Sequence, residues 1–138
     1  MAQALILDSE AVNALARPNA RGTTFNRARA VLALALDRRA LVRVPAPVLA
    51  ELYRGPRHDP AIDRILNGRG IAVIDLTRSI ARQAGHLLAQ AEFSSSHAVD
   101  AFVVATALTF SEAIIATADP DDIGRLAASH PQLKVFAL

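Results

Sequence analysis

The chain has 138 residues, of which 52% are hydrophobic, and its formal net charge at pH 7 is +2. This length is enough to bury one substantial core and too short for two ordinary domains, so we expect a single domain over residues 1–138. The absence of cysteine excludes disulfides, a thiolate nucleophile and a cysteine zinc site, so any bound metal is expected to be held by oxygen.

Short apolar runs alternate with longer helical patterns along the chain. The runs predict buried parallel strands at residues 4–7, 41–44, 71–74, 113–116 and 133–137. The intervening patterns predict helices at residues 10–16, 24–38, 47–54, 60–67, 77–92, 97–110 and 120–129. Thr77 is a predicted cap, and Asp119 followed by Pro120 predicts another helix start. This alternation predicts an α/β fold with three α/β/α layers and a central, mainly parallel five-stranded sheet.

Four acidic residues are predicted to meet at one edge of this sheet. Asp8 ends the first strand and Asp119 follows the fourth, while Glu51 and Asp100 lie in helices that begin near the same edge. Open α/β sheets bind their ligands beyond the carboxyl ends of the strands, near the point where the strand order reverses. We therefore expect the chemistry at this edge.

Each acid also has a structural interpretation. Asp8 and Asp119 are good helix caps, and Glu51 alone is explained as a solvated helix residue. Asp100 lies in a nearly all-apolar helix, where a buried carboxylate needs a cation or several donors. Together the four repel one another unless a cation joins them, and oxygen ligands favour Mg²⁺ or Mn²⁺. One or two such ions suit phosphodiester hydrolysis.

Four segments in order resemble the PIN-domain pattern of VapC-type nucleases: LILDS (5–9), PAPVLAEL (45–52), HAVDA (97–101) and TADPDDI (117–123). The resemblance covers essentially the whole chain. It implies that Asp8, Asp100 and Asp119 bind metal, with Glu51 acting directly or through water. The last segment offers three acids, and we expect Asp119 to be the main one, with Asp122 as an auxiliary metal ligand rather than Asp121.

The same resemblance implies a ribonuclease, the toxin of a VapBC-type toxin–antitoxin pair, that uses a metal-activated water and leaves a 5′-phosphate and a 3′-hydroxyl. It also implies a VapB-like antitoxin partner. We further expect a homodimer. Ser9 and Thr117 match positions where the family often has a small hydroxyl residue, although both are equally well explained as turn formers. Glu10 departs from the pattern by adding a charge beside Asp8.

The charge distribution is consistent with a polyanionic substrate such as RNA. Between Arg17 and Arg82 there are 13 basic and 5 acidic residues, whereas the two ends carry 2 basic and 8 acidic residues. A basic surface beside an acidic cluster suits a metal-dependent nuclease. Candidate phosphate contacts are Arg17, Arg21, Arg27, Arg29 and Arg54. Solvation of helix faces is an equally good interpretation of these arginines.

An antitoxin could place an amphipathic helix over apolar surface near Val12, Leu15 and the predicted helix 24–38. That helix has more apolar residues than one core-facing stripe needs, namely Val31, Leu32, Leu34 and Leu36. These residues could instead form a homodimer contact or, for any single one, the core. A basic tail of the partner could also enter the acidic pocket.

Two alternative functions are compatible with parts of the sequence. A receiver-type phosphoacceptor domain would use Asp8, Asp75, Thr117 and a lysine, but Lys134 lies at the wrong end of its strand. A PIN-like module could bind RNA or a partner with little cleavage.

No apolar run approaches the roughly 18 residues of a membrane span, and residues 1–7 lack the features of a signal peptide. We expect a cytoplasmic protein with no membrane partner.

Overall fold

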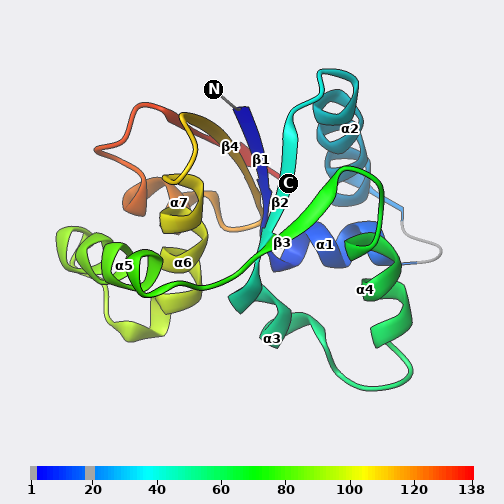
Figure 1. Cartoon of the computed structure of the whole chain (residues 1–138), viewed down its shortest axis with the longest axis horizontal. Coiled ribbons are helices and arrows are strands. Elements are labelled where there is room, and N and C mark those ends of the chain that lie inside the picture. Colours follow the sequence, from blue (N-terminus) through cyan, green and yellow to red (C-terminus); the bar gives the residue numbers. More distant parts are fainter. Residues whose placement is uncertain (1–2, 18–20) are drawn as a thin grey trace.

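The structure is a computed structural model and describes residues 3–17 and 21–138 (Figure 1). Its centre is a five-stranded sheet in the order β3-β2-β1-β4-β5, in which every neighbouring pair is parallel. The strands are β1 (Gln3–Leu7), β2 (Leu41–Pro45), β3 (Ile71–Ile74), β4 (Glu112–Thr117) and β5 (Leu133–Ala137). All five predicted strands are confirmed, each to within one residue at either end.

Helices cover both faces of the sheet. One layer holds α1 (Ser9–Ala16), α2 (Thr23–Asp37) and α4 (Asp59–Leu66), and the other holds α5 (Arg78–Ala91), α6 (Ala98–Ala107) and α7 (Pro120–Leu126) (Figure 1). Helix α1 packs against α2 and α4, while α5, α6 and α7 pack against one another. The predicted three-layer α/β/α architecture is confirmed. Within the described ranges, no helix is long and apolar enough to cross a bilayer.

The predicted helix 47–54 is shorter than expected. A 3-10 turn, η1 (Ala46–Val48), leads into the single turn α3 (Leu49–Leu52), and the chain becomes extended at Tyr53. Asp59 accounts for this early end, because its Oδ1 accepts hydrogen bonds from the backbone amides of Arg54 (3.0 Å) and Gly55 (3.1 Å). A side chain that offers the backbone such partners competes with the helical pattern.

Two other helices end three residues before the predicted residue. Helix α6 stops at Ala107 and α7 at Leu126, where the sequence pattern predicted 110 and 129. At the end of α6 the hydroxyl of Thr109 donates to the carbonyl of Thr106 at 2.7 Å, so the last turn is closed by a side chain. At its start, the short 3-10 helix η2 (Ser95–His97) leads into α6.

The core lies between the sheet and its two helical layers. Leu5, Ile6 and Leu7 of β1 are almost fully buried, as β1 is the middle strand of five. Helix α6 is buried along most of its length and contacts β1, β2 and β4, which explains its nearly all-apolar sequence. Its first turn carries Asp100 to the carboxyl edge of the central strands.

Part of the expected partner surface lies in this core instead. Val12 is 0% exposed and Val31 is 7% exposed, so the expectation that they line a docking surface is wrong. Leu34 and Leu36 are exposed, so neither lies in the core. They are two residues apart on a helix, about 200° around its axis, and therefore lie on different sides of α2.

The strand order excludes the receiver-type alternative. Receiver domains have the order 2-1-3-4-5, in which the first strand lies beside the third. Here β1 lies between β2 and β4. Lys134 is the second residue of β5 and pairs with Ile114, so it lies far from the carboxyl edge at which a receiver needs its lysine.

Candidate functional site

The carboxyl ends of β1 and β4 place two loops side by side. Leu7 pairs with Ala116, and the amide of Asp8 continues the ladder by donating to the carbonyl of Ala116 at 3.2 Å. The chain reverses its direction across the sheet between these two strands, which is the switch point where α/β folds bind ligands. The predicted location of the acids is confirmed for this pair of loops.

Asp8 is held from several sides. It is the N-cap of α1, and its Oδ1 accepts a hydrogen bond from the amide of Ala11 at 2.9 Å. Burial raises the pKa of Asp8, and hydrogen bonds from the Thr117 hydroxyl and from the amides of Ala11 and Ala118 oppose that rise. Asp8 is therefore both a cap and a fixed carboxylate at the site.

Thr117 joins the two loops. Its side chain is fully buried, and its Oγ1 accepts a hydrogen bond from the amide of Asp119 at 2.9 Å. The same hydroxyl donates to the carboxylate of Asp8. One hydroxyl thus fixes the carboxylate that follows β1 and the backbone of the acid that follows β4.

Three further carboxylates form the tightest group. One oxygen from each of Asp100, Asp119 and Asp122 lies within 4.8 Å of the others. The predicted helix start is confirmed, because Asp119 is the N-cap residue of α7 and Pro120 follows it, but the Asp119 side chain makes no capping hydrogen bond. Its carboxylate faces Asp100 and Asp122 instead. Asp121 is exposed and lies outside this group.

The electrostatics of Asp100 show that the other acids converge on it. Burial raises the pKa of Asp100 to about 6, and the charges of Asp119, Asp8, Asp122 and Glu51 contribute to that rise, in that order of size. The pKa of Asp119 is also raised, first by burial and then by Asp122. Such a cluster is strained at neutral pH unless a cation joins it.

The donor atoms fit a hard divalent cation. All are carboxylate oxygens, the ligands that Mg²⁺ and Mn²⁺ prefer, and the described residues place three of them within 4.8 Å of one another, close enough to be drawn onto one ion. Asp8 lies outside that tight group but close enough to act on Asp100. Glu51 is exposed on α3 and also acts on Asp100 by its charge.

A groove of ≈ 620 Å³ runs from this region between α1, α3 and α4. Ser9, Glu10 and Glu51 lie along one part of it. Its basic lining is formed by Arg17, Arg54, Arg57 and His58. Within residues 3–17 and 21–138, no arginine lies within 4.0 Å of a carboxylate oxygen, so the arginines of this groove are not engaged in ion pairs.

The five candidate arginines therefore divide into groups. Arg17 and Arg54 line the groove, and Nη1 of Arg54 is held by the carbonyls of Ala50 at 2.9 Å and Tyr53 at 3.0 Å. On α2, by contrast, Arg27 lies over the ring of Phe136 and Arg29 over the ring of Phe25. Arg21 is exposed outside the groove.

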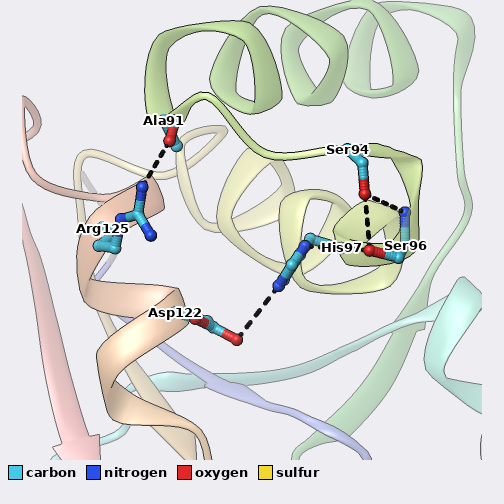
Figure 2. A network of polar contacts seen from close by, with 6 residues as sticks. All are labelled: Ala91, Ser94, Ser96, His97, Asp122 and Arg125. Atoms are coloured by element: carbon cyan, nitrogen blue, oxygen red, sulfur yellow. Dashed lines mark hydrogen bonds and ion pairs between the residues drawn. The ribbon is translucent and has the colours of Figure 1, made fainter.

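Sequence reasoning missed a network beside the acids (Figure 2). Nε2 of His97 lies 3.4 Å from Oδ2 of Asp122. The ring of His97 stacks on Phe93 with centroids 4.1 Å apart. Arg125 lies over Phe93 and donates to the carbonyl of Ala91 at 2.8 Å. Asp122 and Arg125 are three residues apart, so the sequence could have placed them on one face of α7. Their partners, His97 and Phe93, come from another part of the chain.

Comparisons with known proteins agree on the fold. The sequence profile of the family described as the PIN domain matches residues 5–128. The VapBC2 structure from Rickettsia felis, bound to a DNA fragment from its promoter, is similar with a TM-score of 0.69 and 15% identity over 97% of this chain and 98% of that one.

A toxin–antitoxin complex from Klebsiella pneumoniae is similar with a TM-score of 0.64 and 16% identity, over 97% of this chain and 99% of the other. No curated protein matches the sequence significantly.

Proposed function

Because this chain belongs to the PIN-domain family, we propose that it is a metal-dependent endoribonuclease and the toxin of a VapBC-type toxin–antitoxin pair. The observation that carries the proposal is the cluster of Asp100, Asp119 and Asp122, on which the charges of Asp8 and Glu51 also act. Carboxylates gathered at a topological switch point suit phosphoryl chemistry assisted by divalent cations.

The acids have distinct proposed roles. Asp8, Asp100, Asp119 and Asp122 hold Mg²⁺ or Mn²⁺, and Thr117 fixes the carboxylate of Asp8. When bound, the metal supplies charge stabilisation at the phosphate and lowers the pKa of water. Glu51, exposed beside the cluster, accepts a proton from the attacking water. That water adds to phosphorus, the P–O3′ bond breaks, and the released O3′ takes up a proton, leaving a 5′-phosphate and a 3′-hydroxyl.

RNA as the substrate is supported by the groove that begins beside Ser9 and Glu51. Its arginines have no carboxylate partner among the described residues, and a strand lying across the acids can extend into it. Guanidinium groups pair well with phosphate oxygens. We assign the strand beside the scissile phosphate to this groove.

An antitoxin and a second copy of the chain are the proposed protein partners. The two similar structures are described as a VapBC complex and a toxin–antitoxin complex, which supports a VapB-like partner here. A homodimer is supported by apolar side chains left exposed on α2 and β4, namely Leu34 (48%) and Ile114 (38%), which line one depression.

The test is RNA cleavage by the purified chain with Mg²⁺, with Mn²⁺ and with EDTA. We expect EDTA to abolish cleavage and Asp100→Asn to lower it by at least about a hundredfold, since both remove charge stabilisation from the phosphate. Asp37→Asn, an exposed acid at the end of α2, is the matched control and keeps wild-type activity. Full activity in EDTA or in Asp100→Asn contradicts the proposal, and metal-dependent RNA binding without products supports a binding module instead.

A further inference from the structure

One of the three clustered carboxylates, that of Asp122, has a side-chain contact from outside the cluster. Asp122 lies beside Asp100 and Asp119, whose charges push it away, and the imidazole of His97 lies 3.4 Å from its Oδ2 (Figure 2). His97 is 31% exposed and Asp122 is 33% exposed, so both are accessible from the site. An N–H placed at this oxygen would attract the carboxylate and oppose the repulsion.

Two serine hydroxyls form a chain that ends at the other ring nitrogen of His97, Nδ1. The hydroxyl of Ser96 lies 3.3 Å from Nδ1 of His97, and the hydroxyl of Ser94 lies 2.7 Å from that of Ser96. Ser94 Oγ also accepts from the amide of Ser96 at 3.3 Å. With a neutral imidazole, one arrangement satisfies every contact: Ser94 donates to Ser96, Ser96 donates to Nδ1, and Nε2–H faces Asp122.

The ring itself is held by a stack that reaches back to α7. Phe93 and His97 are stacked with an interplanar angle of 18°, and the guanidinium of Arg125 lies 4.2 Å from the centroid of Phe93. Two groups this close to one centroid must occupy opposite faces of the ring. Arg125 is three residues after Asp122, so the stack joins the turn carrying the acid to the segment between α5 and α6.

We propose that His97 is a positioning residue for the acidic site, with Ser94 and Ser96 setting its tautomer and Phe93 setting its ring plane. Its significance for metal binding rests on the proposed function. Residues that orient metal ligands from outside the coordination sphere typically change metal affinity by about 10- to 100-fold when mutated. We expect replacement of His97 or Ser96 to weaken metal binding by a factor in this range, because each helps to fix the position of Asp122.

The test is the affinity for Mn²⁺ alone, measured by isothermal titration. His97→Phe keeps a ring to stack on Phe93 but has no donor, and it should weaken Mn²⁺ binding about tenfold. His97→Gln keeps an N–H near the position of Nε2 and should stay within about threefold of the wild type. His86→Phe, an exposed histidine on α5, is the matched control.

A second readout needs no metal. In ¹⁵N spectra of the imidazole, the wild-type His97 should show the Nε2–H tautomer, and Ser96→Ala should shift the population toward Nδ1–H and weaken Mn²⁺ binding. Ser79→Ala, an exposed serine on α5, should do neither. A role of His97 in packing alone would leave the tautomer unchanged in Ser96→Ala.

The outcomes separate this inference from the proposed function. Wild-type Mn²⁺ affinity in both His97→Phe and Ser96→Ala overturns the positioning role alone. A wild-type protein that binds no Mn²⁺ overturns the metal site and this inference with it. If Mn²⁺ binding weakens as expected while no variant, nor the wild type, cleaves RNA, the positioning role stands and the proposed activity falls.

Discussion

At the scale of single residues, Asp100 makes the stability of the metal-free protein depend on pH. Its pKa is about 6 in the fold against an ordinary value of 3.8. Well below pH 3.8 the Asp100 carboxyl is protonated in both the folded and the unfolded state, so its burial does not reduce the free energy of unfolding. The cost develops as pH rises from 3.8 to about 6 and is complete above that.

We therefore expect Asp100→Asn to be more stable than the wild type in EDTA above pH 6. The full shift corresponds to about 3 kcal/mol, and solvent screening of this half-exposed carboxyl reduces the gain to about 1 kcal/mol, or a few degrees in Tm. Near pH 4 the difference should nearly vanish. Thermal melting at both pH values measures it, and an equal difference at pH 4 and pH 7 would contradict the electrostatic origin.

A second residue-scale prediction concerns the hydroxyl of Thr117. Thr117→Val keeps the shape but leaves the Asp119 amide and the Asp8 carboxylate without their shared partner. Loss of such buried hydrogen bonds costs about 1–3 kcal/mol, and displacement of Asp8 should also lower RNA cleavage. Denaturant unfolding and cleavage assays measure both effects. Thr117→Ser should restore both, and a Val variant with wild-type stability and activity would assign Thr117 to packing.

The acids differ in how far their environments could be predicted. Asp100 was identifiable because a carboxylate in an apolar helix has few alternatives to a cation. The carboxylate of Asp119 was expected to cap its helix, a local pattern that the structure replaces with the Thr117 hydroxyl bonded to the Asp119 amide. The contact between His97 and Asp122 depends on how two distant helices pack, and local sequence patterns carry no record of that.

At the scale of elements, the groove between α1, α3 and α4 predicts which arginines contact RNA. Arg54 and Arg57 line the groove, whereas Arg27 and Arg29 lie on α2 against aromatic rings. In an Asp100→Asn background, Arg54→Gln with Arg57→Gln should reduce the slope of log affinity against log salt. The reduction should be about 0.7 for each phosphate of the single strand that no longer pairs with an arginine.

The matched control is Arg27→Gln with Arg29→Gln, which should leave the slope unchanged. Fluorescence anisotropy with a labelled RNA over a range of salt concentrations measures both pairs. A larger decrease of the slope in the α2 pair than in the groove pair would show that the strand follows α2 instead.

The boundaries of the elements were predictable where the pattern was strong. Thr77 caps α5 as expected, with its Oγ1 accepting from the amide of Ile80 at 3.2 Å. Helix α3 was predicted too long, because Asp59 binds the backbone of Arg54 and Gly55 from a neighbouring segment. Helix periodicity describes one segment at a time and does not include such a competing partner.

At the scale of the whole molecule, the fold class followed from alternation but the strand order did not. Buried apolar strands that alternate with helices require a parallel sheet. Several strand orders are nevertheless compatible with short, right-handed connections between those strands. The observed order puts β1 beside β4 and so joins Asp8 to the loop of Thr117 and Asp119. The same packing buries Val12 and Val31. Fewer apolar side chains are therefore exposed around α1 and α2 than the sequence pattern indicated.

The acidic cluster predicts how a protein partner inhibits. A carboxylate group that gathers cations also accepts an arginine, which can bridge two carboxylates, so a basic tail of the antitoxin should compete with Mg²⁺ for Asp100, Asp119 and Asp122. The complex formed by co-expression with a candidate antitoxin should regain RNA cleavage as Mg²⁺ is titrated in. Replacing every basic residue of the tail with glutamine should release inhibition at low Mg²⁺ while apolar contacts keep the complex together. A complex whose inhibition survives those replacements would show that the partner blocks the RNA path without entering the cluster.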